Sequence, residues 1–310
     1  MRTTSRVLER FFGSPSEPFA VIPSKARNLA LSVRGKLREE SGSENAGKAR
    51  FLASLGMTGP GLLGASVVLT MLLGTLGTSY ATERAWEREF PLPPAGRVSV
   101  ENVHGAIWIE VWDQSKVEAT VLMRSSGKTD RLDDVQVAVE ARSGSLAFHT
   151  LYPGDLDVPV QVDYHLRVPR QAHLEQLSTL EGGIAVHDVE GPVSARSLHG
   201  DIEGVDLAGA VEARALTGNI RVSWRSLPCP TDRVKLETVS GDVILQLPPR
   251  ADADLELATV AGHILGRYAF QASAVPGDAT RRVHLGDGGV RIRLRTVRGD
   301  IQVAERPEEL

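Results

Sequence analysis

Three aspartates hold the same position in a short phrase that recurs along the chain: Asp201, Asp242 and Asp300. Each follows a glycine and precedes Ile or Val, so a fold that stacks the phrases would bring the three carboxylates into one column. Paired carboxylates are what glycoside cleavage needs, one as the acid and the other as the base or nucleophile. The aspartates therefore raise the hypothesis of a polysaccharide-modifying enzyme on a β-helix scaffold.

The other copies of the phrase argue against a catalytic column. Their equivalent positions carry Gly183, Asn219 and His263, which interrupts the row of carboxylates. A turn-forming role explains Asp and Asn alike, because either side chain can bond to the local backbone and stabilise a bend. The dense Gly-Gly-x-Gly-x-Asp repeats that bind calcium are absent from the sequence. We therefore assign no catalytic residue.

Four histidines also fall in or near the repeated phrases: His104, His187, His199 and His263. Clustered imidazoles can bind zinc. However, His104 and His199 precede the glycine of their phrase whereas His263 follows it, so the three should not share a face. No Gly-x-Ser-x-Gly, phosphate loop or dinucleotide fingerprint occurs in the sequence. We expect neither a metal nor a cofactor.

The phrase consists of an aliphatic residue, any residue, Gly, a further small or polar residue, and then Ile or Val. It occurs seven times, at residues 103–107, 180–184, 198–202, 216–220, 239–243, 260–264 and 297–301. Gly182, Gly200 and Gly218 follow one another at intervals of 18 residues, and the later intervals between glycines of the phrase are 23, 21 and 37 residues. Repetition at spacings of tens of residues is typical of stacked-repeat architectures.

An interval of 18 residues is too short for a propeller blade or a leucine-rich unit with a helix. It suits one coil of a β-solenoid, with two or three short strands between tight corners. Glycine supplies the positive φ that a corner needs, and we expect the flanking Leu or Val and Ile or Val to point inward and stack. The corner residues are predicted to be Gly105, Gly182, Gly200, Asp201, Gly218, Asn219, Gly241, Asp242, Gly262, Gly299 and Asp300.

The 37-residue interval is about two coils long, and one corner near residues 276–278 is expected to have lost its phrase. Upstream, strands with period-two alternation are predicted around 98–111 and at 117–123, 135–139, 146–149 and 158–168. We expect these strands to cap the N-terminal end and residues 290–303 to cap the C-terminal end. The predicted fold class is all-β: a β-helix-like solenoid of seven to nine short stacked coils with an irregular N-terminal β cap.

One hydrophobic helix is expected before this domain, at residues 59–81. The segment is uncharged from 62 to 76 and ends in Ser79-Tyr80-Ala81, with the small residues that a signal peptidase accepts. Cleavage after Ala81 would make it a signal peptide; without cleavage it would be a single transmembrane helix of about 20 residues. Either outcome places residues 82–310 outside the cytoplasm, in the periplasm, the outer envelope or at the cell surface.

Charge is distributed unevenly along the chain. Residues 1–81 hold ten Lys and Arg against five Asp and Glu, and residues 82–310 hold 25 against 34. Residues 1–58 are expected to be a disordered basic segment, unless the chain starts at Met57. An acidic body repels phosphates, so we expect no nucleic-acid partner and membrane contact only through residues 59–81. The single cysteine, Cys229, excludes an internal disulfide.

The phrase Val-x-x-Gly-Asp-Ile/Val, the leading strand 98–109 and the alternating strand that ends at Val168-Pro169 resemble the bacterial β-strand-repeat proteins known as adhesins, a family of unknown function. The likeness covers about residues 85–305 and is clearest over 174–305. It implies an exported β-solenoid-like domain. That family has no established catalytic residues, so none is carried over.

The first functional hypothesis is an exported, non-enzymatic domain for adhesion or cell-envelope interaction, whose partner is an envelope protein or a glycan. The alternatives are the polysaccharide-modifying enzyme and a membrane-anchored periplasmic sensor or accessory domain. Recognition would use strand faces or exposed edges. Trp108 points to the face opposite Ile107 and Ile109; it would either contact a carbohydrate or protein or pack under a capping strand, and we expect the packing.

Overall fold

The computed structural model describes residues 82–126, 131–152, 159–268, 271–272 and 280–306. Contacts divide the chain into two units, Met1–Thr78 and Ser79–Leu310, and all of these residues belong to the second. The expected basic segment, the expected signal or transmembrane segment and Ala81 lie outside the described residues. In the part of the chain that is described, no helix has the length and apolarity to cross a membrane.

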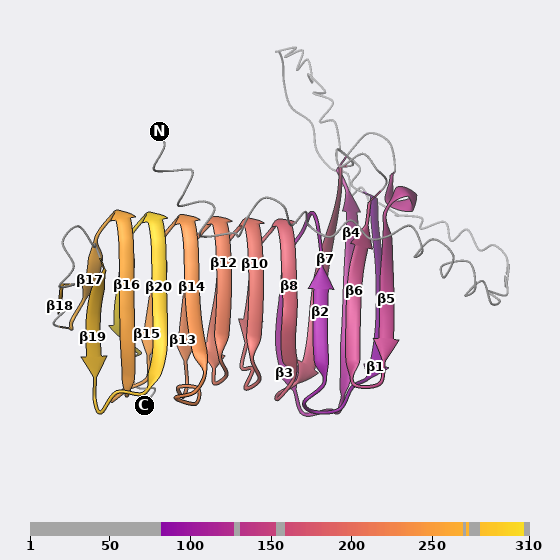
Figure 1. Ribbon diagram of the computed structural model, residues 1–310. Helices are drawn as coiled ribbons and strands as arrows, with labels where there is room; N and C mark the ends of the chain where they lie inside the picture. The colour runs from indigo at the N-terminus through magenta and orange to yellow at the C-terminus, as the bar shows by residue number, and fades with distance from the viewer. Residues whose placement is uncertain (1–81, 127–130, 153–158, 269–270, 273–279, 307–310) are drawn as a thin grey trace, which may run out of the picture. The chain divides into compact units, whose positions relative to one another are not determined.

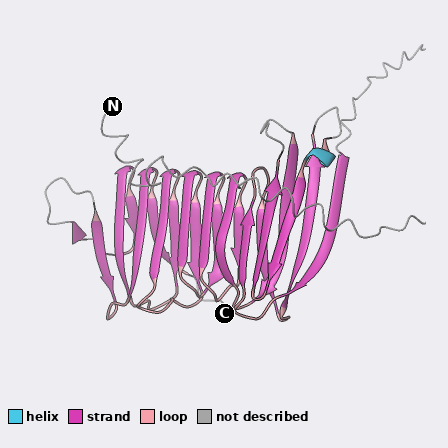
Figure 2. Ribbon diagram, turned by 45° about the vertical axis from the view of Figure 1, so that its right-hand side comes forward, coloured by secondary structure: helices cyan, strands magenta, loops and turns pink. Residues whose placement is uncertain are grey.

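Two large β-sheets make up the described residues, as the sequence predicted for an all-β chain (Figure 1). Sheet A contains, in spatial order, β1 (Thr82–Pro91), β4 (Lys116–Ser125), β7 (Val160–Pro169), β3 (Ile107–Trp112), β9 (Ile184–His187), β11 (Ile202–Leu207), β13 (Ile220–Trp224), β15 (Val243–Leu247), β21 (Ile301–Glu305) and β17 (Ile264–Gly266). The one helical element among these residues is a short 3-10 turn, Leu132–Asp134 (Figure 2).

Sheet B contains, in spatial order, β18 (Gln271–Ala272), β19 (Arg281–Leu285), β16 (Ala253–Ala261), β20 (Val290–Arg298), β14 (Arg233–Ser240), β12 (Val211–Thr217), β10 (Val193–His199), β8 (His173–Glu181), β2 (Arg97–Glu101), β6 (Ser145–Leu151) and β5 (Gln136–Arg142). From β8 to β15 the chain alternates between the sheets, one strand in sheet B and the next in sheet A. Each repeat therefore contributes two strands, and neighbouring repeats pair in parallel.

Equivalent positions of the repeated phrase pair directly. Ile202 lies opposite Ile184 on one side and Ile220 on the other. These side chains are at most 3% exposed and lie between the two sheets. The inward stacking predicted for the Ile or Val of each phrase is confirmed for six of the seven copies, and Ile264 of the seventh is half-buried.

The aliphatic residue before each glycine lies elsewhere than predicted. Ser197 is 1% exposed and points into the core, so Leu198, the next residue of the same strand, points to the outer face of sheet B. The same alternation places a column of aliphatic side chains on that face: Leu180, Leu198, Leu216, Val239, Val297 and Val260. The expectation that these residues stack inward is wrong, because a strand can bury only every second residue.

Eight strand pairs follow one another along the two sheets, and two of them are out of chain order. The pair β2–β3 lies between β6–β7 and β8–β9. Likewise, β20–β21 lies between β14–β15 and β16–β17. Residues 290–303 are therefore an internal repeat, and the prediction that they cap the C-terminal end is wrong.

The strands at the two ends of the sheets run antiparallel to their neighbours. At one end these are β1, β4 and β5, which accounts for part of the expected N-terminal cap. Strand β1 was not predicted, and its last residue, Pro91, falls at the sheet edge where proline is tolerated. At the other end β19 runs antiparallel to β16 and β18 to β19, so these two strands extend sheet B. The corner expected near residues 276–278 lies outside the described residues.

The glycines of the repeated phrase line up in one column at the turns from sheet B to sheet A. Gly182, Gly200, Gly218 and Gly241 have φ between 147° and 151°, a region that residues with a Cβ adopt only with strain. A Cβ at Gly218 would also collide with the carbonyl oxygen of Gly200 in the neighbouring repeat. These four glycines have the positive φ that the sequence analysis expected at a corner, and close approach between repeats adds a second reason for glycine at these positions.

We predict that Gly218→Ala lowers the free energy of unfolding by about 3 kcal/mol or more, because it combines left-handed strain with a backbone clash. The matched control is Gly183→Ala: the added Cβ would lie 3.4 Å from the Asp201 carbonyl oxygen, and the φ of Gly183 is not left-handed. This control should change stability by less than about 1 kcal/mol. Urea unfolding of both variants checks the prediction, and equal losses would contradict it.

We also predict that Leu294→Ala, in β20, costs about 2–5 kcal/mol of stability, the range for emptying a fully packed leucine site. Leu294 is fully buried because β20 has neighbours on both sides. Leu265→Ala in β17 is the control, since Leu265 is 47% exposed and its truncation should cost less than about 0.5 kcal/mol. Thermal unfolding measures both. A loss at Leu294 no larger than that at Leu265 would mean that β20 is not an internal strand.

Candidate functional site

The aspartates and asparagine singled out from the sequence lie in one column beside the glycine turns. The side chain of Asp201 accepts a hydrogen bond from the Asn219 backbone N–H at 2.7 Å. In the same way Asn219 accepts from Asp242 at 2.9 Å, Asp242 from Asp300 at 2.7 Å, and Asp300 from His263 at 2.7 Å. Each side chain thus holds the backbone of the next repeat along the sheet.

These bonds assign the column a structural role. The sequence predicted that Asp and Asn bond within their own bend, but the bonds run between repeats, a distinction that only the stacking order reveals. Asn219 serves as well as Asp201 because either residue offers a side-chain oxygen as acceptor. Gly183 has no side chain to contribute, so this run of bonds begins at Asp201.

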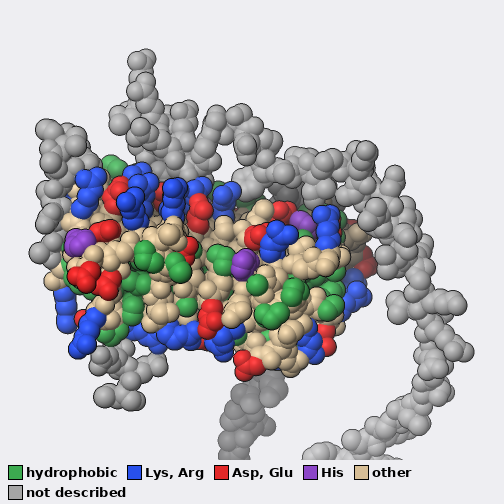
Figure 3. All heavy atoms as spheres, turned by 60° about the horizontal axis from the view of Figure 1, so that its bottom comes forward, with side chains coloured by type: hydrophobic (Ala, Val, Ile, Leu, Met, Phe, Trp, Pro, Cys, Tyr) green, Lys and Arg blue, Asp and Glu red, His purple; other side chains and the backbone are tan. Residues whose placement is uncertain are grey.

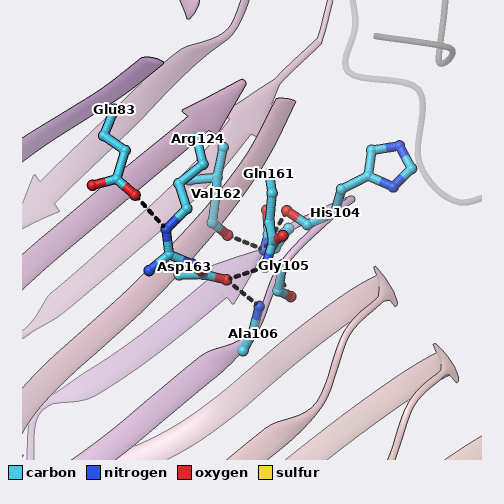
Figure 4. A network of polar contacts seen from close by, with 9 residues as sticks. Glu83, His104, Gly105, Ala106, Arg124, Gln161, Val162 and Asp163 are labelled. Carbon is cyan, nitrogen blue, oxygen red and sulfur yellow. Dashed lines mark hydrogen bonds and ion pairs between the residues drawn. The ribbon is translucent and has the colours of Figure 1, made fainter. Parts of the chain in front are cut away.

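A further aspartate, Asp163 of β7, occupies the same column without the repeated phrase (Figure 4). One carboxylate oxygen accepts from the Ala106 backbone N–H at 2.9 Å and from the Gln161 amide at 2.9 Å, and the other accepts from Arg124 at 2.8 Å. Asp163 is only 6% exposed, and three donors stabilise its buried charge. Asp163 is not marked in the sequence, because Val162 stands where the phrase has glycine.

A second column, of Ser and Thr, also escaped the sequence analysis. Three residues before the glycine, a buried hydroxyl donates to the glycine carbonyl oxygen of the neighbouring repeat. The donors and acceptors are Thr179 to Gly105, Ser197 to Gly182, Thr238 to Gly218, Thr296 to Gly241 and Thr259 to Gly299, at 2.9–3.1 Å. The recurrence of Ser or Thr at this position was the signal available. Ala215 interrupts it, and Asn102 replaces the hydroxyl with an amide that donates to the Val162 carbonyl oxygen at 2.8 Å.

The four histidines considered as zinc ligands are not brought together. His104 contacts Glu181 through Nδ1 at 3.0 Å, and His263 contacts Asp300 through Nδ1 at 3.4 Å, in turns of different repeats. His187 lies on the outer face of sheet A. Across the described residues, no group of three or more His, Cys, Asp or Glu side chains is placed to hold a metal ion.

Trp108 does not pack under a capping strand, contrary to expectation. It stands on the outer face of sheet A and is 40% exposed, because β4 and β1 extend the sheet sideways and do not cross its face. The His187 ring stacks beside the indole at 5.3 Å between centroids and 9° between planes, and the His165 ring at 6.2 Å and 14°. The indole N–H donates to Glu110 at 2.9 Å.

Charged groups adjoin these rings on the same face. Arg167 lies 5.7 Å from the centroid of the Trp112 ring, a cation–π distance, and contacts Glu118 at 3.0 Å. We call Trp108, Trp112, His165, His187 and Arg167 the aromatic patch. Rings with polar edges on an open surface can supply apolar contact area and hydrogen bonds to one ligand.

Two open depressions lie away from both the aspartate column and the aromatic patch. One, of about 300 Å³, is bordered by Arg97, Glu140, Arg142 and Glu175 on the outer side of sheet B. The other, of about 480 Å³, adjoins the residues from Pro91 to Pro93. Neither contains Asp201, Asp242 or Asp300, the carboxylates from which the enzyme hypothesis arose. We take the aromatic patch as the candidate functional site.

Comparisons with known proteins give structural likenesses only. No protein-family model matches the chain, and no curated protein matches it by sequence. The structure is similar to that of a "putative cell adhesion protein" from Clostridium sporogenes, with 11% identity, 72% of this chain and 100% of that chain covered, and a TM-score of 0.38.

Two further solved structures are similar at lower scores. One is a "putative adhesin" from Bacteroides fragilis, with 8% identity, 71% and 97% coverage and a TM-score of 0.30. The other is a "putative lipid binding protein" from Parabacteroides distasonis, with 9% identity, 72% and 97% coverage and a TM-score of 0.26.

Proposed function

We propose that residues 82–306 form a two-sheet β-solenoid, exported to the cell envelope, that acts as a non-enzymatic binding domain of the adhesin type. The observation that carries this proposal is the exposure of Trp108 within the aromatic patch. A large ring left uncovered on a flat sheet face loses the free energy that its burial would contribute. A partner that covers it recovers that free energy, which is why Trp residues dominate many binding surfaces.

The chemistry of the patch favours a glycan as the partner. Sugar rings present C–H faces with hydroxyls at their rims, so they need an apolar surface bordered by donors and acceptors. The patch provides the indole of Trp108 with Glu110 at its N–H, and the imidazole of His165, whose nitrogens can donate or accept. His187 adds a stacked ring whose Nε2 is buried. The aspartate column supports a binding role over an enzymatic one, since its side chains are engaged in bonds between repeats.

We predict that Trp108→Ala in the full-length chain weakens glycan binding at least tenfold and leaves the unfolding temperature within about 2 °C. Retention on immobilised peptidoglycan, chitin, cellulose and dextran would measure it. Val260→Ala is the matched control, because Val260 is a 71% exposed side chain on the other sheet. The glycan assignment fails if the wild-type chain is retained on none of these supports, or if Trp108→Ala is retained as well as Val260→Ala.

Export is tested separately, by N-terminal sequencing of the protein recovered from fractionated bacteria. We predict that the protein is in the envelope fraction and begins at Thr82, because cleavage after Ala81 would release it from residues 59–81. A longer N-terminus in the inner-membrane fraction would instead identify an anchored domain, the sensor or accessory alternative. Recovery from the cytoplasm alone would contradict both forms of the proposal.

A further inference from the structure

Sheet B carries a dense group of basic side chains on its outer face, which we call the basic face. Its members are Arg196, Arg214, Arg233, Lys235, Arg282, Arg291, Arg293 and Arg295, on β10, β12, β14, β19 and β20. The acidic side chains in the same rows are Glu212, Glu237, Asp254 and Glu256. The excess is positive although residues 82–310 as a whole hold nine more acidic than basic residues. Figure 3 shows a band of Lys and Arg along its upper border.

The basic face places like charges directly beside one another. Arg233 of β14 pairs in register with Arg291 of β20, and Lys235 pairs with Arg293. On the other side of β20, Arg291 and Arg293 pair in register with Asp254 and Glu256 of β16. Paired residues on one face of neighbouring strands lie about 5 Å apart, and like charges in that relation are destabilising. The scaffold itself does not need this arrangement, since elsewhere on the same face Arg214 contacts Glu237 at 3.5 Å.

Two of the four carboxylates of this region are partly covered by the basic groups, whereas the side chains of Glu212 and Asp254 are 45% and 46% exposed. The side chain of Glu237 is 11% exposed, and that of Glu256 is 28% exposed between Arg293 at 3.3 Å and Arg295 at 3.5 Å. By contrast, Arg233 and Arg291 are exposed and make no ion pair with any other residue that the structure describes. The outer face of sheet B therefore presents more cations than carboxylates to solvent, and Arg233 and Arg291 are two cations that no described carboxylate neutralises in an ion pair.

We propose that the basic face binds a linear acidic polysaccharide, laid across successive repeats. Neighbouring strands are about 4.8 Å apart and same-face residues along a strand about 6.6 Å, so the cations form a regular grid. A polymer with carboxylate or sulfate groups at regular intervals meets several of these cations without entering a pocket. Bidentate hydrogen bonds from arginine suit such oxyanions. This site is on the opposite sheet from the aromatic patch and does not depend on it.

Other polyanions fit the basic face less well. Strands β10, β12, β14, β16, β19 and β20 contain no Phe, Tyr or Trp, so they offer no platform for stacking nucleic-acid bases and no aromatic anchor for a membrane interface. A broad sheet face also cannot enter a duplex groove as a helix or two-stranded ribbon does. Duplex DNA and anionic vesicles are therefore the competing ligands in the test.

The test uses the full-length chain, with polygalacturonate as the probe and neutral dextran as its uncharged counterpart. We expect binding to polygalacturonate that weakens as salt is raised, and no binding to dextran through this face. The double variant Arg233→Gln/Arg291→Gln should bind at least tenfold more weakly. Its unfolding temperature should be unchanged or higher, because the repulsion between the two guanidinium groups is removed, an effect that damage to the fold would not produce.

The matched control is Arg221→Gln/Arg267→Gln, which removes the same charge from exposed positions in β13 and just after β17, on the sheet A side. Its affinity should stay within about twofold of the wild type at 50 mM salt, because screening confines each charge to its own face. The proposal is overturned if the chain does not bind polygalacturonate, or if both double variants lose affinity equally. It is also overturned if duplex DNA or phosphatidylglycerol vesicles bind more tightly at the same salt concentration.

Discussion

The close approach of backbones at the glycine turns is the constraint on which the stacked repeats depend. A Cβ at Gly200 would collide with the carbonyl oxygen of Gly182, and one at Gly218 with that of Gly200. Once the backbones are that close, their polar groups are shielded from water and need partners. The buried hydroxyls supply donors to the glycine carbonyls, and the Asp or Asn side chains supply acceptors to the next N–H groups. The glycine, the hydroxyl and the Asp or Asn side chain thus form one structural unit, which is repeated along the sheets.

The repeat and its turns could be predicted from the sequence because they are local. An 18-residue interval, period-two alternation and a recurring glycine are all visible within one repeat. The order of the strands in the sheets is not a local property. The pair β2–β3 precedes β6–β7 in the chain but lies between β6–β7 and β8–β9 in the sheets, and β20–β21 lies between β14–β15 and β16–β17. Nothing in an alternating strand says which other strand it pairs with. Leu198 and its equivalents were wrongly expected to point into the core, because a regular column of aliphatic side chains can form on an outer face as well as in a core.

The candidate site could be predicted only in part, because it too depends on which strands are neighbours. The alternation of the strand placed Trp108 on the face opposite Ile107 and Ile109, but it could not show what covers that face. The antiparallel strands β1 and β4 could have crossed the face; instead they lengthen the sheet. The stacking of His165 and His187 on the indole required the register of three strands that are far apart in sequence. Asp163 joined the turn column through the same long-range register, without any glycine to mark it.

The ends of the sheets explain why binding is better sought on their faces. At one end β1 is a long, exposed edge strand that carries Glu83, Arg84, Glu87, Arg88 and Glu89. At the other end of sheet A, β17 has only three residues. Charged and very short edge strands both disfavour the addition of another strand. Both edges of sheet A are protected in this way, which favours the outer faces as binding surfaces. The residues that differ between repeats make those faces unlike: aromatic on sheet A and basic on sheet B.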